Sequence, residues 1–140
     1  MAVNFVGGDK FVQDKMYITT SANLADKTLI TFAGAAPANA AVAWGVIEKD
    51  TKSGDAATVK YGNSIVEVLA TGTVTAGNEV EALQGTVYAN IDGVSTSTTS
   101  AGVQDLAVAG TSYPIGRAIT GSDAYGTVLV MLYTHQNKAV

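Results

Sequence analysis

Few side chains in this sequence have the types and the spacing that catalysis needs. Glu79 and Glu81 flank Val80, so on a strand both carboxylates would point to one side, where two acids can couple. His135 is the one histidine, and Ser64 lacks the second glycine of a nucleophile elbow. We expect the two acids and His135 to be solvated surface residues and Ser64 to be no nucleophile. An enzyme or small-ligand barrel that uses these four residues is kept as an alternative.

Cofactor-binding patterns are also missing from the chain. It contains neither G-x-x-x-x-G-K-[ST] nor G-x-G-x-x-G, the loops whose backbone amides approach phosphates. With no cysteine and one histidine, it cannot form the usual thiolate or two-histidine metal sites. Its aspartates show no calcium-loop spacing. The sequence therefore predicts no catalytic residues, no cofactor and no metal.

The charge content points away from nucleic acids and membranes. Charged residues make up 14% of the chain, against about 25% in an ordinary soluble domain. The net charge of −4 comes from residues 61–140, which contain two basic and six acidic residues. No basic stripe could neutralise phosphates, and the longest apolar run, residues 128–133, is far shorter than a membrane span. Residues 1–9 have no signal-peptide pattern. We expect a chain that buries surface against other protein subunits.

The spacing of the glycines predicts the elements that must position these residues. From Gly34 to Gly126, successive glycines are never more than eleven positions apart, which leaves no room for long helices. The intervening segments are rich in Val, Ile, Thr and Tyr, so the pattern predicts an all-β, barrel-like domain of short strands. The expected strands are residues 28–33, 42–48, 57–61, 64–70, 86–91, 113–119 and 127–134.

Three segments depart from this pattern. Residues 1–27 are expected to form an N-terminal arm ahead of the domain at 28–140, with a short helix at 21–27 capped by Ser21. Residues 34–41 are expected to be a loop. The polar stretch at 95–100 is typical of an exposed loop tip.

Two further features suggest contacts between subunits. The expected strand at 127–134 is apolar on both faces, which predicts a place at the centre of the core or between subunits. Trp44 has small neighbours, so we expect a core anchor or the centre of a subunit contact. Residues 61–64 and 91–94 carry the Gly, Asn and Asp residues that hairpin turns use.

Four segments in order resemble a known family. They read AWGVIEKD at 43–50, GDAATVKYG at 54–62, ATGTVTAGNEV at 70–80 and IGRAITGSDAYGTVLV at 115–130. Together they resemble the capsid decoration, or cement, proteins of tailed bacteriophages. The small β-barrels of that family share the sequence pattern G-hydrophobic-A, then G-x-x-V, then V-G-R-A. The resemblance covers about residues 43–134. Residues 1–30 match no pattern of that family.

The resemblance implies a β-tulip domain and a homotrimer. Such a trimer would sit on the outer surface of the phage capsid, at three-fold or quasi-three-fold positions, with the major capsid protein as partner. The protein would be made in the bacterial host cytoplasm and end in the virion. Trp44 and Arg117 are expected at the subunit interface. A head fibre base or a tail or baseplate module remains an alternative. The residues expected to contact the capsid are Asn4, Phe5, Val6, Phe11 and Tyr17.

Overall fold

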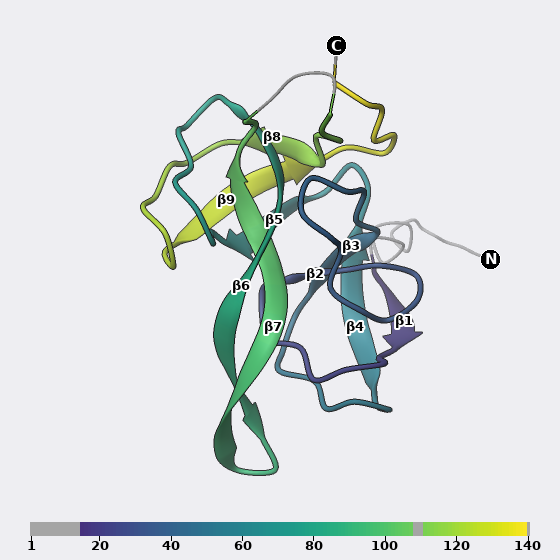
Figure 1. Ribbon diagram of the computed structural model, residues 1–140. Helices are drawn as coiled ribbons and strands as arrows, with labels where there is room; N and C mark the ends of the chain where they lie inside the picture. The colour runs from purple at the N-terminus through teal and green to yellow at the C-terminus, as the bar shows by residue number, and fades with distance from the viewer. Residues whose placement is uncertain (1–14, 108–110, 140) are drawn as a thin grey trace, which may run out of the picture.

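The computed structural model describes residues 15–107 and 111–139, and these form one antiparallel sheet of nine strands (Figure 1). The all-β prediction is confirmed. The order of the strands across the sheet is β1-β4-β3-β2-β7-β6-β8-β9-β5. Their bounds are Lys15–Thr19 (β1), Leu29–Ile30 (β2), Gly45–Ile47 (β3), Ala56–Tyr61 (β4), Ile65–Leu69 (β5), Glu79–Ile91 (β6), Val94–Asp105 (β7), Gly116–Ala118 (β8) and Thr127–Leu132 (β9).

One end of the sheet curls back on itself and gives the domain its barrel-like form. β5 is the last strand in the order, yet Ala70, just beyond it, forms a parallel bridge to Val103 in β7. The amide of Thr71 also donates to the Val103 carbonyl. Strands β7, β6, β8, β9 and β5 therefore surround a common interior, and β2, β3, β4 and β1 extend the sheet from β7. In Figure 1, β9 is on the left of the β6–β7 hairpin and β3, β4 and β1 are on its right.

The alternation of side chains places buried residues on both faces of the central strands. Leu29 and Val46 belong to the main core inside the curled sheet, whereas the adjacent Ile30 and Ile47 belong to a second core beneath β1 and β4. Successive strand residues point to opposite faces, so β2 and β3 are buried on both. The main core also contains, from the other strands of the barrel, Val66, Val68, Val80, Ala82, Ala101, Val103, Ala118, Val128, Val130 and Leu132.

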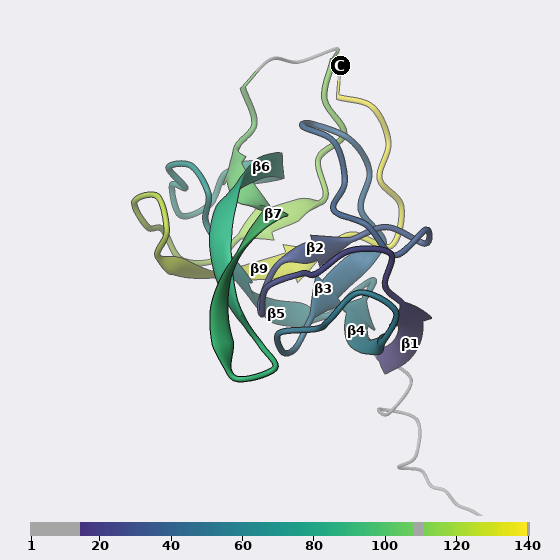
Figure 2. The same ribbon diagram turned by 60° about the horizontal axis from the view of Figure 1, so that its bottom comes forward.

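The longest element is the β6–β7 hairpin, which extends beyond the other strands in Figure 1 and lies to the left of β2, β3, β4 and β1 in Figure 2. Its two-residue turn consists of Asp92 and Gly93, with φ of 54° and 81°, so the expected turn at 91–94 is confirmed. The prediction of a loop tip at 95–100 is wrong, because these residues lie in β7. Thr98 and Ser100 are buried on the face of β7 opposite Ala101, and Thr98 Oγ1 donates to the Val87 carbonyl. A polar stretch could thus form a strand by bonding its buried hydroxyls within the sheet.

Other local expectations are also corrected by long-range contacts. The predicted helix at 21–27 is absent, because Leu24 exchanges both backbone hydrogen bonds with Thr51 and Lys27 takes a φ of 62°. The turn expected at 61–64 is present, but it joins β4 to β5, which are not neighbours in the sheet, so it makes no hairpin.

Residues 34–41 form no strand, as expected. Within the expected arm, residues 15–19 form β1 and pair with β4, while Leu24 and Ala25 are buried.

Candidate functional site

The outer face of strands β5 and β9 carries large apolar side chains that the domain does not cover. Of the two places expected for this strand, the centre of the core fits only one face of β9: Val128, Val130 and Leu132 are buried, and the alternate residues are exposed. A place between subunits stays a prediction for the other face. The exposed fractions are 52% for Ile65, 46% for Ile119, 36% for Leu129 and 40% for Met131. We call these four residues the apolar patch.

The strand register places the members of the apolar patch beside one another. Ile65 in β5 lies opposite Met131 in β9, and the amide of Ile119 donates to the Leu129 carbonyl. Side chains directly opposite on an antiparallel pair are about 5 Å apart, so these four form one continuous surface. The sequence allowed a place between subunits for the strand at 127–134, but it did not indicate which residues face outward, because the run at 127–132 has no polar alternation.

Arg117, expected at a subunit interface, borders the apolar patch. It lies in β8 directly opposite Met131, is exposed, and donates from its guanidinium to the Gly77 carbonyl at 2.6 Å. On its other side Arg117 faces Glu79 of β6. The structure thus places a fixed cation at the rim of an exposed apolar surface, an arrangement common at protein interfaces, where arginine is enriched.

Trp44 lies elsewhere in the sheet, next to β3 and away from Arg117. Its indole ring packs 4.0 Å from the ring of Phe32 and 5.3 Å from that of Tyr61, measured between ring centres. It also donates its Nε1 hydrogen to the Met16 sulfur. Trp44 is half-buried, while Phe32 is 64% exposed. Trp44 therefore anchors the second core with one face and borders an exposed aromatic surface with the other.

The capsid-contact residues expected in the N-terminal arm are mostly outside the described part of the chain. Asn4, Phe5, Val6 and Phe11 lie outside it. Tyr17 lies in β1 opposite Thr58, at one edge of the sheet, and is 73% exposed. Its ring is thus available to a partner, and the role of the other four residues stays a prediction.

The residues considered for catalysis are held in structural hydrogen bonds. Glu81 is only 4% exposed, so its expected place on the surface is wrong: its carboxylate accepts from Gln104 Nε2 at 2.8 Å and from the Ala107 amide at 3.2 Å. Glu79 Oε2 accepts from the Tyr133 hydroxyl at 2.7 Å. Burial, and then the bond to Glu79, raise the pKa of Tyr133. The two acids thus have separate partners: Glu81 links β6 to the neighbouring β7, and Glu79 links β6 to the residue that follows β9.

Ser64 and His135 complete the set of residues considered for catalysis. Ser64 is buried and its hydroxyl donates to the Tyr61 carbonyl inside the turn before β5. His135 is exposed after the end of β9, as expected. Among residues 15–107 and 111–139, no three or more His, Asp or Glu side chains are grouped so that they could hold a metal ion.

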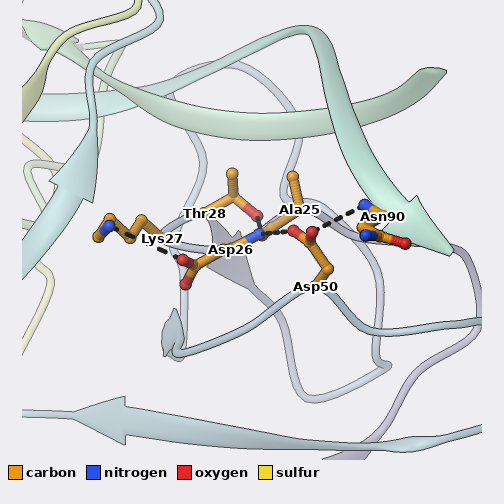
Figure 3. A network of polar contacts seen from close by, with 6 residues as sticks. All are labelled: Ala25, Asp26, Lys27, Thr28, Asp50 and Asn90. Atoms are coloured by element: carbon orange, nitrogen blue, oxygen red, sulfur yellow. Dashed lines mark hydrogen bonds and ion pairs between the residues drawn. The ribbon is translucent and has the colours of Figure 1, made fainter. Parts of the chain in front are cut away.

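A second pair of acidic residues, Asp26 and Asp50, lies beside the β6–β7 hairpin close to its turn (Figure 3). Asp50 accepts from the amide of Asp26 at 2.8 Å with one oxygen and from the amide of Asn90 at 2.7 Å with the other. Burial raises the pKa of Asp26, Lys27 at 3.7 Å lowers it, and the nearby Asp50 raises it further. The carboxylate of Asp50 thus ties the hairpin to the loop before β2.

We expect Asp50→Ala to lower the free energy of unfolding by about 2 kcal/mol, since two backbone amides lose their acceptor together. Denaturant unfolding followed by circular dichroism would measure the change. Asp55→Ala is the control, because it removes an exposed carboxylate nearby and should change stability by less than about 0.5 kcal/mol. Equal stability of the two variants would mean that the Asp50 bonds contribute nothing.

Comparisons with known proteins add no family to these observations. No protein-family model matches the chain, and no curated protein sequence matches it. In the part of the chain that the structure describes, no helix is long and apolar enough to cross a membrane.

Proposed function

We propose that this chain is a structural protein of the phage virion, a decoration or cement protein that binds the outside of the mature head. It acts as a homotrimer at three-fold or quasi-three-fold positions and ties neighbouring major capsid subunits together. It needs no catalytic residue and no cofactor. The support comes from the resemblance of residues 43–134 to that family and from the surface of the folded domain.

The observation that carries the proposal is the apolar patch. Monomeric proteins rarely leave large apolar side chains side by side on one face, and such surfaces mark protein contacts. The low charge content of the chain agrees, because a protein that works within an assembly needs fewer charges for solubility. A trimer with cyclic symmetry joins two different surfaces of each subunit. The apolar patch with Arg117 supplies one of them, and the exposed rings near Trp44 supply a candidate for the other.

The proposed effect on the capsid follows from mass action. A protein that binds the expanded lattice, and not its dissociated subunits, stabilises the lattice by an amount that grows with its concentration above the dissociation constant. Many weak contacts repeated over the head would add up, so each site needs little affinity. The exposed ring of Tyr17 and the arm residues Asn4, Phe5, Val6 and Phe11 are proposed to contact the capsid.

The test is addition of the purified protein to expanded, empty heads that lack it. We expect it to sediment with the heads, to saturate at three copies per three-fold position, and to raise the temperature at which the heads break. Binding to unexpanded heads is the control and should be weaker. Particles assembled without the protein should keep their tails but have fragile heads. Intact heads with missing fibres, tails or baseplates would instead indicate the alternative virion component.

A further inference from the structure

The far part of the β6–β7 hairpin has one face that the domain leaves uncovered (Figure 1). Alternate residues of β6 share a face, and on this one Val80 and Ala82 belong to the main core. Beyond the pair of Gln84 and Ala101, the residues that continue the same face are exposed. We call this surface the hairpin face. It consists of Thr86, Tyr88 and Asn90 of β6 and, directly opposite them, Thr99, Ser97 and Ser95 of β7.

The side chains of the hairpin face are uncharged, and each of them can form hydrogen bonds. Four are serine or threonine, one is the amide of Asn90, and one is the phenol of Tyr88. Each of these groups can both donate and accept. Among the described residues, none of the six side chains has a hydrogen-bond partner. The ring of Tyr88 is 67% exposed and lies in the middle of its row. The hairpin face therefore offers one aromatic ring surrounded by free hydroxyl and amide groups.

Contacts on the other side of the hairpin hold the hairpin face in place. Ala89 and Ile91 are buried and pack with Ala25 in a small apolar cluster. The carboxylate of Asp50 accepts a hydrogen bond from the backbone amide of Asn90 at 2.7 Å. A surface that is ordered before it binds a ligand loses little conformational entropy on binding. The few contacts that one face of a hairpin can make are then enough for weak binding.

The composition of the hairpin face selects one class of ligand. Phosphates and carboxylates are bound by cations, and a basic partner is bound by acids, but the six residues of the hairpin face include neither. The core of a protein interface needs more apolar surface than one tyrosine ring supplies. A neutral sugar fits both features that are present. Its hydroxyls pair with hydroxyl and amide groups, and the C–H groups of its ring pack on the negative face of an aromatic ring.

We propose that the hairpin face binds a neutral glycan, with one sugar ring stacked on Tyr88 and its neighbours in the glycan bonded by the serine, threonine and asparagine side chains. The residues involved belong neither to the apolar patch nor to the rings near Trp44, so the site goes beyond the proposed function. We expect a dissociation constant of about 1 mM for a short oligosaccharide. Many copies of the chain on one particle would add such weak contacts together, but binding by the free protein does not depend on that assembly.

Titration of the purified protein with neutral hexasaccharides of glucose, mannose, galactose and N-acetylglucosamine tests the proposal, with amide NMR shifts as the readout. We expect one or more of the four to bind, with the shifts concentrated at residues 84–99 and with equal affinity at low and high salt. Tyr88→Ala should weaken binding about tenfold or more, while Tyr88→Phe keeps the ring and should retain it. The matched control is Val94→Ala, which shortens a 63% exposed side chain on the opposite face of the same hairpin.

Three results would overturn the proposal. The first is no binding of any of the four hexasaccharides at about 10 mM, and the second is equal binding by the unaltered protein and Tyr88→Ala. The third is a loss of subunit association or of binding to expanded heads in Tyr88→Ala, because the hairpin face would then contact protein. The titrations contain no capsid, so their failure leaves the proposed function untouched. Failure of the unaltered protein to bind heads would likewise leave the glycan site untouched.

Discussion

Gly102→Ala should destabilise the domain by about 3 kcal/mol or more, the upper range for adding a methyl group to a packed interior. Gly102 lies in β7, where the curled sheet closes against the end of β5. A Cβ atom on it would overlap the Leu69 carbonyl oxygen and lie 2.9 Å from Thr71 Cγ2. The obstacle is largely backbone, so β5 and β7 would have to separate and the Ala70–Val103 bridge would be lost. For a domain with a total stability of about 5–15 kcal/mol, this is a large loss.

The matched control for this substitution lies in the same hairpin. Gly85 in β6 is nearly opposite, and the nearest atoms to an added Cβ would be side-chain atoms of Tyr125 and Thr71, at 3.2 and 3.3 Å. These side-chain atoms can move by a few tenths of an ångström, so Gly85→Ala should change stability by less than about 1 kcal/mol. Denaturant unfolding at equal, low protein concentration compares the two variants. If they unfolded alike, the close crossing of β5 and β7 would be contradicted.

The closure at Gly102 also shows what sequence reasoning could and could not supply. The regular glycines and the β-branched residues between them predicted the all-β class and seven strands near their observed places. They could not predict that Ala70 meets Val103, because that contact joins residues 33 positions apart. The prediction of a helix at 21–27 is wrong for the same reason. The capping preference of Ser21 is local, and the two backbone hydrogen bonds between Leu24 and Thr51, which are distant in sequence, determine the conformation instead.

The candidate site was predicted only in part. The sequence indicated Arg117 and Trp44 as two separate interface residues, and the structure places each beside exposed apolar side chains in different parts of the sheet. The apolar patch depends on the register between β5 and β9, strands that lie far apart in the sequence. The expectation for Glu81 is also wrong. A charged residue beside a turn is expected in solvent, but Glu81 is buried and its carboxylate accepts a hydrogen bond from the side-chain amide of Gln104.

Met131→Glu should leave the folded subunit intact and weaken the proposed association into trimers by about 100-fold, the equivalent of about 3 kcal/mol. Met131 is at the centre of the apolar patch and is 40% exposed, so its side chain can become charged without entering the core. Arg117 is directly opposite on β8, and a glutamate there could form an ion pair with it in the free subunit. In an association that covers the patch, the added carboxylate would lose its water, and the pairing with Arg117 would repay only part of that cost.

Light scattering over a range of protein concentrations measures this effect, with Met131→Leu as the control. The leucine variant keeps an apolar side chain of similar size, so the proposed trimer should form with it as with the unaltered protein. The free energy of unfolding of the glutamate variant should equal that of the unaltered subunit measured under conditions where subunits are dissociated. This comparison distinguishes a loss of association from a loss of folding.

If the glutamate variant still formed trimers at the same concentration, the apolar patch would lie outside the subunit interface, and its exposed side chains would be available to face the capsid. Binding of that trimeric variant to expanded heads would then decide whether the patch contacts the major capsid protein, because a buried charge should weaken that contact by the same mechanism.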